Sequence, residues 1–359
     1  MGLLTIGAFA HASRLSAKAL RRYDELGLLP PARVDPFTGY RYYDETQLER
    51  ARLVAWLRRI RMPLARIREV CDRSESDPAA AARDIRAYWA QVEAETAARR
   101  DLALFLVDQL SGKDTDTMSH HTMDLGFRYA ARSDRGLVRE TNQDAVYAGS
   151  RLLAVADGYG GDGARAGTAA IEALRPLDEP GDAVSSQAGD LLNALEDAVR
   201  RANTAVTGLD GSGTTLTALL WTGSRLALVH IGDTRAHLLR GGELFRITHD
   251  HTVVQSMIDE GTLTAEEAVS HPRRAMLLRA LDGNEDHARP DLRLHEARPG
   301  DRYLLCSDGL FTIVPDAAIL QILSTVADPE AAVDELVALA HGAGGPDNIA
   351  CVVADVVPL

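Results

Sequence analysis

The chain has 359 residues, more than one typical hydrophobic core accommodates, so we expect at least two domains. Its apolar content of 46% and charged content of 25% are ordinary for globular proteins, and no apolar run approaches the roughly 20 residues of a membrane span. Three widely separated cysteines and the lack of a signal-peptide pattern argue against a disulfide framework and favour reduced thiols in the cytoplasm.

The net charge of −13 is unevenly distributed along the sequence. Residues 1–70 contain 13 Lys and Arg against 7 Asp and Glu, a net charge of +6, so the remainder carries −19. A basic end on an acidic protein indicates a polyanionic partner for that end alone.

The first predicted elements form a helix-turn-helix. Thr5 and Ser16 can cap two short helices, over 6–12 and 17–26. Three apolar residues of the second helix have the spacing of a buried face: Leu20, Tyr23 and Leu26. The basic residues then lie largely outside, as in a helix that contacts the major groove of DNA. By spacing alone, a solvated basic helix in a helical bundle is the alternative interpretation.

The stretch ALRRYDELGLLPPARVDPFTGYRYYDETQLERARLVAWLRRIRMPLARIREV continues with an aromatic- and arginine-rich turn and a further capped helix from Asp44. Over residues 3–70 the sequence resembles the MerR family of winged-helix transcription regulators nearly end to end. The resemblance implies that five side chains around the recognition helix face DNA: Arg14, Lys18, Arg21, Arg22 and Tyr23. It also implies a wing against the DNA phosphates, formed by Arg33, Tyr40 and Arg41.

A long helical pattern follows over 79–110, with apolar residues at heptad-like positions that Arg99 interrupts once. Such a stripe can also pack on its own domain. In the MerR family the corresponding helix forms an antiparallel coiled coil, so the resemblance implies a homodimer. Only Cys71 lies nearby, which disfavours a metal-sensor function. The polar stretch 111–124 is typical of a linker.

Residues 214–247 alternate apolar strands with very short turns, and such connections join antiparallel strands in a meander. Helical patterns lie outside this region, at about 187–204, 251–260, 315–324 and 329–341. The pattern predicts an antiparallel sheet core covered by helices.

Aspartates recur at or beside the ends of apolar strand segments: Asp144, Asp157, Asp233, Asp308 and Asp347. Any one of them can be an ordinary turn residue. Their repetition predicts convergence on one sheet edge, where their mutual repulsion requires cations. Hard divalent ions with oxygen ligands, Mn²⁺ or Mg²⁺, suit such a set, and Gly158 allows a backbone carbonyl to approach an ion.

The chemistry that fits this set is hydrolysis of a phosphate ester. Arg139 offers a planar fork for phosphate oxygens, and a two-metal carboxylate site beside it suits in-line attack of water. Other phosphate chemistries fit badly. No cysteine is followed six residues later by arginine, as a thiolate phosphatase requires, and there is no Walker lysine.

Over residues 125–357 the sequence resembles bacterial type 2C, metal-dependent protein serine/threonine phosphatases. The matching motifs include SDRGLVRETNQDAV, LLAVADGYGG, VHIGDTRAHLLR, PGDRYLLCSDGL and GGPDNIACVV. The family fold is an αββα sandwich of two antiparallel sheets. One departure is Tyr159, where animal members have a histidine proposed as the general acid, so the leaving group must take its proton from water.

The resemblance also implies residue roles. Asp157 would bridge two ions, with the carbonyl of Gly158 on one and Asp308 and Asp347 on the other. Asp233 with Asp308 matches a third, weaker ion site. Arg139 matches the phosphate-binding arginine, and Asp144 would hold a metal-bound water.

We therefore predict a multidomain protein: a MerR-like winged helix-turn-helix DNA-binding domain over 1–75, a dimerisation helix over 76–112, a linker over 113–124 and a type 2C phosphatase domain over 125–359. The expected fold is an all-α winged helix-turn-helix with a coiled-coil dimer helix, then an α+β sandwich. We expect a cytoplasmic bacterial regulator, at the nucleoid when bound to an inverted-repeat operator, that also hydrolyses phosphoserine and phosphothreonine in a phosphoprotein substrate. The alternative is a regulator whose phosphatase fold only senses a ligand or phosphoprotein.

Overall fold

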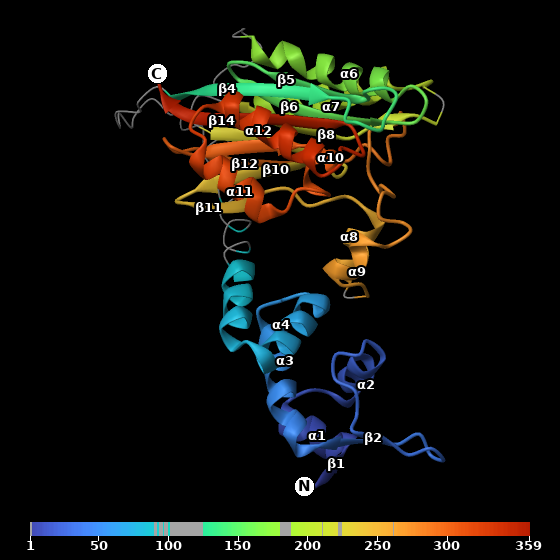
Figure 1. Cartoon of the computed structure of the whole chain (residues 1–359). Coiled ribbons are helices and arrows are strands. Elements are labelled where there is room, and N and C mark those ends of the chain that lie inside the picture. The colour runs from blue at the N-terminus through green and yellow to red at the C-terminus, as the bar shows by residue number, and fades with distance from the viewer. Residues whose placement is uncertain are drawn as a thin grey trace. The chain divides into compact units, whose positions relative to one another are not determined.

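A computed structural model describes residues 2–89, 92, 96, 100, 125–179, 188–209, 211–221, 225–260 and 262–359. By their contacts, Met1–Glu93 and Val253–Met276 form one compact unit, and Ala94–Thr252 with Leu277–Leu359 form a second (Figure 1). Within the described residues, no helix is both long and apolar enough to cross a membrane.

The first unit begins with the two capped helices that the sequence predicts. Helix α1 (Ile6–Ser13) starts at Thr5, whose side chain accepts a hydrogen bond from the Ala8 amide, and α2 (Ala17–Glu25) starts at Ser16 in the same way. Arg14, between them, has a left-handed φ of 59°, and this residue ends α1.

A small sheet packs beside these helices, with strands in the order β1-β3-β2. The strands are β1 (Leu3–Thr5), β2 (Arg33–Val34) and β3 (Arg41–Asp44). Asp44 then forms a capping box with Gln47, which opens a 3₁₀ turn and the helix α3 (Leu48–Arg59). Helix α4 (Leu64–Ser76) follows. Fully buried side chains from the helices and β3 form one core, among them Phe9, Leu20, Tyr43, Val54 and Ile67.

The predicted dimerisation helix is described only in part. Residues 78–89 are helical, and Tyr88 packs into the core of the first unit. Most of the remaining heptad positions and the whole linker 113–124 lie outside the described residues. The first unit also contains α8 (Val253–Asp259) and α9 (Ala265–Val269), and Arg68 forms an ion pair of 3.2 Å with Glu267.

The second unit contains two antiparallel sheets. One has the order β11-β10-β13-β14-β4, formed by β4 (Leu125–Asp134), β10 (Arg235–Arg240), β11 (Glu243–Arg246), β13 (Arg302–Cys306) and β14 (Ile349–Pro358). The other has the order β12-β9-β8-β6-β5, formed by β5 (Asp144–Ala148), β6 (Leu152–Tyr159), β8 (Leu216–Trp221), β9 (Arg225–Ile231) and β12 (Asp291–Glu296), and the short β7 (Gly213–Thr214) pairs with β6.

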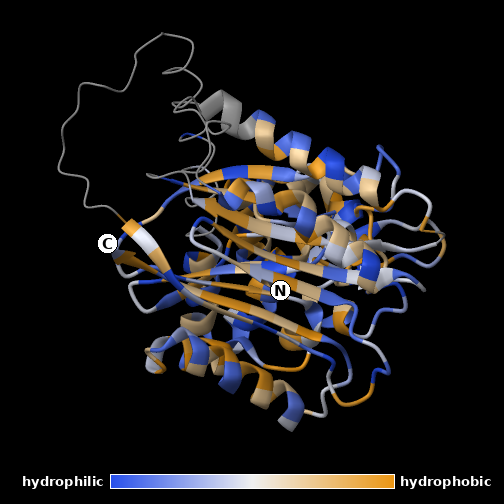
Figure 2. Ribbon diagram, turned by 90° about the horizontal axis from the view of Figure 1, so that it is seen from above, coloured by the Kyte–Doolittle hydropathy of each residue, from blue (hydrophilic) through white to orange (hydrophobic). Residues whose placement is uncertain are grey.

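The alternation of side chains along each strand explains the layers. On β6, Leu153 and Val155 pack toward the other sheet, whereas Leu152, Ala154 and Ala156 pack against helices. Helices α6 (Gly163–Leu174) and α7 (Ala188–Ala205) share a core with this sheet, and α10 (Asp308–Phe311), α11 (Asp316–Thr325) and α12 (Pro329–Gly342) share one with the other sheet. Figure 2 shows the strands coloured largely as hydrophobic. The second unit is therefore the predicted sandwich of antiparallel sheets with helices outside.

The meander predicted over 214–247 is wrong at one point. Strand β9 belongs to one sheet and β10 to the other, so the connection between them changes sheet instead of closing a hairpin. Gly232 in this connection has a φ of 102°, which favours glycine. Both strands pair in antiparallel fashion as predicted, but β10 pairs with β13 and β11 and not with β9.

Candidate metal and phosphate site

The five aspartates singled out from the sequence come from both sheets of the second unit. Asp144 begins β5 and is the cross-strand partner of Asp157 on β6. Asp233 follows β9, Asp308 begins α10 directly after β13, and Asp347 lies two residues before β14.

Their carboxylates lie close enough to affect one another's protonation. The pKa of Asp157 is raised well above its ordinary value by burial and by the charges of the other four aspartates. Burial and the charge of Asp308 likewise raise the pKa values of Asp144 and Asp233, each to about 7. The chain thus gathers five mutually repelling carboxylates, an arrangement that a cation would stabilise.

Neighbouring polar groups hold two of these aspartates in place. The hydroxyl of Ser307, which is fully buried, donates to Oδ2 of Asp144 over 2.6 Å and accepts a hydrogen bond from the Ala350 amide. The amide of Asp157 donates to the hydroxyl of Thr215 over 3.0 Å. Ser307 and Thr215 were not predicted as site residues, although Ser307 lies inside the quoted motif PGDRYLLCSDGL.

A single asparagine organises the loop that contains Arg139. The side-chain amide of Asn348 donates to the carbonyl oxygens of Arg135 and Thr141, and its Oδ1 accepts from the Gln143 amide. Asn348 was also missed as a site residue. Its position directly after Asp347 in GGPDN is the signal that would have found it, because one turn then fixes both the loop and a carboxylate.

Arg139 lies beside the carboxylates. Its Nη2 donates to Oδ2 of Asp347 over 2.7 Å, and the charges of Asp308 and Asp157 also act on it. The Arg139 side chain is 54% exposed, so its remaining N–H groups are open to solvent. The structure therefore brings together a guanidinium group and all five predicted carboxylates.

Two glycines allow the backbone to pack tightly around this site. A Cβ on Gly158 would lie 2.1 Å from the carbonyl oxygen of Gly163, so no side chain fits there. Gly136 has a φ of 72°, and a Cβ on it would lie 2.1 Å from the carbonyl oxygen of Asp347.

The donor set fits hard divalent cations. It consists of carboxylate oxygens with a backbone carbonyl nearby, which Mn²⁺ and Mg²⁺ prefer over nitrogen or sulfur ligands. Within the described residues, no three His, Cys, Asp or Glu side chains already stand together at ligating positions. The fit therefore rests on the chemistry and burial of the carboxylates.

Two buried histidines near Asp233, His230 and His251, have structural partners. Nδ1 of His251 accepts from the Gly232 amide, and Nε2 of His230 bonds with the carbonyl oxygen of His249. All three cysteines of the chain are buried and unpaired, as expected for reduced thiols.

In the first unit, four of the five residues predicted around the recognition helix are exposed: Arg14, Lys18, Arg21 and Arg22. Tyr23 differs from the other four. It is 7% exposed and packs in the core with Leu20, so most of its ring is turned away from solvent. The i, i+3 spacing that places it beside Leu20 turns the ring inward.

The hairpin of β2 and β3 presents Arg33 and Tyr40 to solvent, and the Arg33 guanidinium lies over the ring of Tyr42 at 5.6 Å. Arg41 is only half-exposed because its Nε donates to Oδ2 of Asp24 over 2.6 Å. Arg41 thus braces the hairpin against α2, and this ion pair would compete with a contact to phosphate.

Comparison with known proteins agrees with this geometry. Residues 4–74 match the MerR HTH family regulatory proteins, and residues 137–344 match protein phosphatase 2C. The chain therefore belongs to the protein phosphatase 2C family, with a MerR HTH family region at its N-terminus.

Two curated relatives and one solved structure illustrate the similarity. The serine/threonine protein phosphatase PstP of Mycobacterium tuberculosis is 54% identical over 244 residues, which cover 65% of this chain and 46% of PstP. The chain thus spans about half the length of that relative. The serine/threonine phosphatase stp of Listeria innocua is 33% identical over 233 residues, 61% of this chain and 91% of stp. The catalytic domain of PstP in complex with two manganese ions matches with a TM-score of 0.58 and 51% identity, covering 65% of this chain and 99% of that one.

Proposed function

We propose that this protein is a DNA-binding regulator whose second unit is a metal-dependent phosphatase for phosphoserine and phosphothreonine in proteins. The strongest support for this proposal is that Arg139 and five buried or half-buried aspartates lie close together in a phosphatase 2C fold. A non-catalytic sensor would have no need of repelling carboxylates together with an arginine that is partly exposed beside them.

Each side chain has a proposed role. Asp157, Asp308, Asp347 and the carbonyl of Gly158 would hold two Mn²⁺ or Mg²⁺ ions, and Asp233 with Asp308 would hold a third. The ions, when bound, would supply the Lewis acidity that activates water for in-line attack on phosphorus.

The chain's own groups do the rest. Arg139 would bind two phosphate oxygens through its exposed N–H groups and align the ester. Asp144, fixed by Ser307, would accept a hydrogen bond from the attacking water and orient it. Proton transfer to the leaving serine or threonine oxygen would come from solvent, because Tyr159 at the corresponding position has its pKa raised to about 12 by burial and is a weak acid.

For the first unit we propose specific binding to double-stranded DNA. The exposed Arg14, Lys18, Arg21 and Arg22 around α2 would contact the major groove, and the hairpin of β2 and β3 would act as a wing. A homodimer through the 76–112 helix would bind an inverted-repeat operator, with the protein in the cytoplasm and at the nucleoid. The domain boundaries given above are part of this proposal.

Hydrolysis of phosphoserine and phosphothreonine peptides tests the enzymatic half. We expect activity with Mn²⁺ or Mg²⁺, none in EDTA, and none in Asp157→Ala or Asp308→Ala. Asp197→Ala, which removes a carboxylate paired with Arg200 on the surface of α7, is the matched control and should retain full activity. Full turnover in EDTA, or undiminished activity in Asp157→Ala, would contradict the two-metal proposal and favour the sensor alternative.

A further inference from the structure

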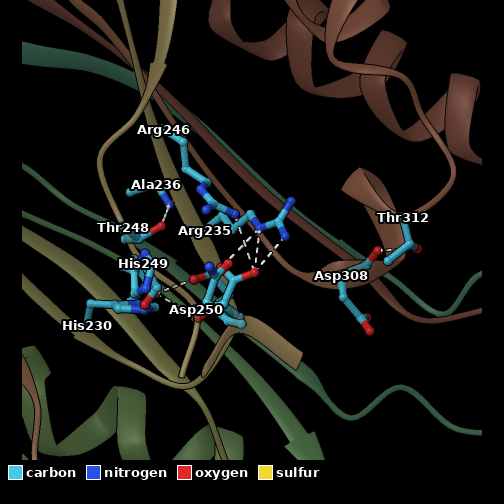
Figure 3. Close-up of polar contacts among 12 residues, drawn as sticks. His230, Arg235, Ala236, Arg246, Thr248, His249, Asp250, Asp308 and Thr312 are labelled. Carbon is cyan, nitrogen blue, oxygen red and sulfur yellow. Dashed lines mark hydrogen bonds and ion pairs between the residues drawn. The ribbon is translucent and has the colours of Figure 1, made fainter. Parts of the chain in front are cut away.

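An ion pair outside the metal and phosphate site connects to two of its aspartates. Arg235, the first residue of β10, binds Asp250 through both sides of its guanidinium, with Nη2 to Oδ2 at 2.6 Å and Nε to Oδ1 at 3.1 Å (Figure 3). The Asp250 side chain is 8% exposed. A second arginine, Arg246, approaches the same carboxylate at 3.4 Å.

This pair is charged as well as buried. Burial opposes ionisation of Asp250, but the charges of Arg246 and Arg235 more than offset it and hold its pKa below the ordinary value. A buried, bidentate arginine–carboxylate contact fixes both side chains in one geometry.

The guanidinium of Arg235 also supports the helix that begins at Asp308. It stacks on the ring of Phe311, the last residue of α10, at 3.6 Å from the ring centroid. In the backbone, Arg235 pairs with Cys306, two residues before Asp308. The Thr312 hydroxyl donates to the carbonyl oxygen of Asp308 and closes the turn (Figure 3).

The segment around Asp250 is bonded to the turn that contains Asp233. The amide of His251 donates to the carbonyl oxygen of Gly232, and the Gly232 amide donates to Nδ1 of His251. The next residue after Gly232 is Asp233. The segment is also held by His230, whose Nε2 bonds with the carbonyl oxygen of His249 (Figure 3).

We propose that Asp250 and Arg235 are positioning residues for the phosphatase reaction: they fix Asp308 through Phe311 and Asp233 through Gly232, and so set the affinity of the carboxylate site for divalent cations. Neither residue is assigned contact with the phosphate or the attacking water. The inference rests on the proposed function only for the identity of the reaction, because cation affinity can be measured without turnover.

The same strand offers a matched control. At the other end of β10, Arg240 forms an equally close bidentate pair with Asp301, with Nη2 to Oδ2 at 2.6 Å and Nε to Oδ1 at 2.7 Å. Asp301 is 2% exposed. Arg240 also donates to the carbonyl oxygen of Glu296, and Asp301 accepts from the Arg298 amide, so this pair is bonded to residues outside the five site aspartates. Its loss should lower folding stability without moving those aspartates.

The test is Mn²⁺ binding by isothermal titration calorimetry in the full chain, together with the Mn²⁺ dependence of phosphopeptide hydrolysis. For Asp250→Asn and Arg235→Lys we expect Mn²⁺ affinity to fall about tenfold, as is typical when partners of metal ligands are removed. The Mn²⁺ concentration for half-maximal rate should rise equally, while KM for the phosphopeptide at saturating Mn²⁺ stays unchanged. Asp301→Asn should leave unchanged both the Mn²⁺ affinity and the Mn²⁺ concentration that gives the half-maximal rate.

A milder variant covers the case in which the ion-pair variants fail to fold. Phe311→Leu keeps the ion pair and removes only the ring under Arg235, and it should weaken Mn²⁺ binding by a smaller factor. Unchanged Mn²⁺ affinity in folded Asp250→Asn or in Phe311→Leu would overturn the inference, as would an equal loss in Asp301→Asn. Absence of hydrolysis by the wild type, with tight Mn²⁺ binding that Asp250→Asn weakens, would refute the proposed function and leave the positioning role supported.

Discussion

Nη2 of Arg139 lies 2.7 Å from Oδ2 of Asp347, so the group proposed to bind phosphate is bonded to a group proposed to bind a cation. The two come from loops 208 residues apart in sequence, and Asn348 ties these loops together through three hydrogen bonds. The proposed phosphate-binding and cation-binding groups are therefore held in place by the same asparagine.

Arg139→Lys keeps the charge but loses the two-pronged fork, and Arg139→Ala loses both. We expect kcat/KM for a phosphopeptide to fall about 10- to 100-fold in the alanine variant, the range for loss of a hydrogen bond to a charged group. The kcat/KM of Arg139→Lys should lie between that of Arg139→Ala and that of the wild type. Arg135→Ala, in the same loop, should change the rate little. Steady-state kinetics at saturating Mn²⁺ measure this, and equal rates for wild type and Arg139→Ala would contradict the assignment.

The carboxylate cluster should destabilise the fold when no cation is supplied. The pKa of Asp233 is raised to about 7 by burial and by the charge of Asp308, above its value in the unfolded chain. Its contribution to stability is therefore favourable below about pH 4 and is lost as the pH rises through 7. In EDTA at pH 8, Asp233→Asn should be more stable than the wild type, on the order of 2 kcal/mol.

Thermal unfolding in EDTA at pH 5 and pH 8 checks this expectation. The stability of Asp233→Asn should exceed that of the wild type by more at pH 8 than at pH 5. Added Mn²⁺ should raise the unfolding temperature of the wild type more than that of Asp157→Asn, because the ions bind only the folded state. A lower stability of Asp233→Asn in EDTA at pH 8 would show that the carboxylates do not repel one another in this way.

Buried histidines should make the fold sensitive to acid. Burial is the largest cause of low pKa values at three histidines: about 3 for His230 and His237, and about 4 for His295. The unfolded chain takes up these protons near pH 6.5, so the stability that the neutral rings provide is lost as the pH falls from 6.5 toward 4. At pH 5, each of these histidines should lower the free energy of unfolding by about 2 kcal/mol relative to neutral pH.

His237→Leu isolates one of these contributions, since its Nδ1 is buried without a hydrogen-bond partner in the described structure. Urea unfolding at pH 7.5 and pH 5 should show a smaller loss of free energy of unfolding in this variant than in the wild type. Parallel losses in both proteins would rule out His237 as a source of acid sensitivity.

Specific binding to DNA should depend on α2 and on salt. Lys18 and Arg21 are both exposed on this helix, so their joint replacement by alanine should abolish the specific shift of a selected operator in a gel assay. Wild-type affinity should fall as salt rises, through counterion release. Tyr23→Phe is a useful contrast, because the ring is buried and the change should leave operator affinity nearly intact. Affinity that responds neither to salt nor to the double change would exclude the DNA-binding proposal.

Cation binding and operator binding should influence each other. Residues 253–276 belong to the first unit by their contacts but continue into the second unit at both ends, so the chain passes three times between the units. Operator affinity with and without Mn²⁺, in wild type and Asp308→Asn at fixed ionic strength, measures the coupling. Linkage requires operator DNA to change Mn²⁺ affinity by the same factor. An identical Mn²⁺ response of both proteins would show that the two halves are energetically independent.

Local signals in the sequence were enough to place the helix starts and the aspartates. Thr5, Ser16 and Asp44 cap helices because their side chains reach amides only three residues away or fewer, and such contacts need no knowledge of the fold. The aspartates were recognisable because each stands at or near the end of an apolar strand.

Non-local contacts were the ones that sequence reasoning missed. The change of sheet after β9 depends on which strand β10 finds as its partner, and that partner, β13, is more than 60 residues away. Ser307 supports Asp144 across 163 residues of sequence. Tyr23 fitted two patterns in the sequence, a buried helix face and a DNA-facing set, and only its packing in the core is seen in the structure.

The pairing of β14 with β4 has a consequence for the order of events during synthesis. Strand β4 leaves the ribosome early in the second unit, yet all ten of its residues pair with β14, the last strand of the sandwich. Until β14 is made, β4 lacks its partner and the sheet edge bearing Asp308 lacks Asp347. Under the proposed function, the helix-turn-helix that would bind DNA is therefore synthesised before the strand that completes the phosphatase sheet.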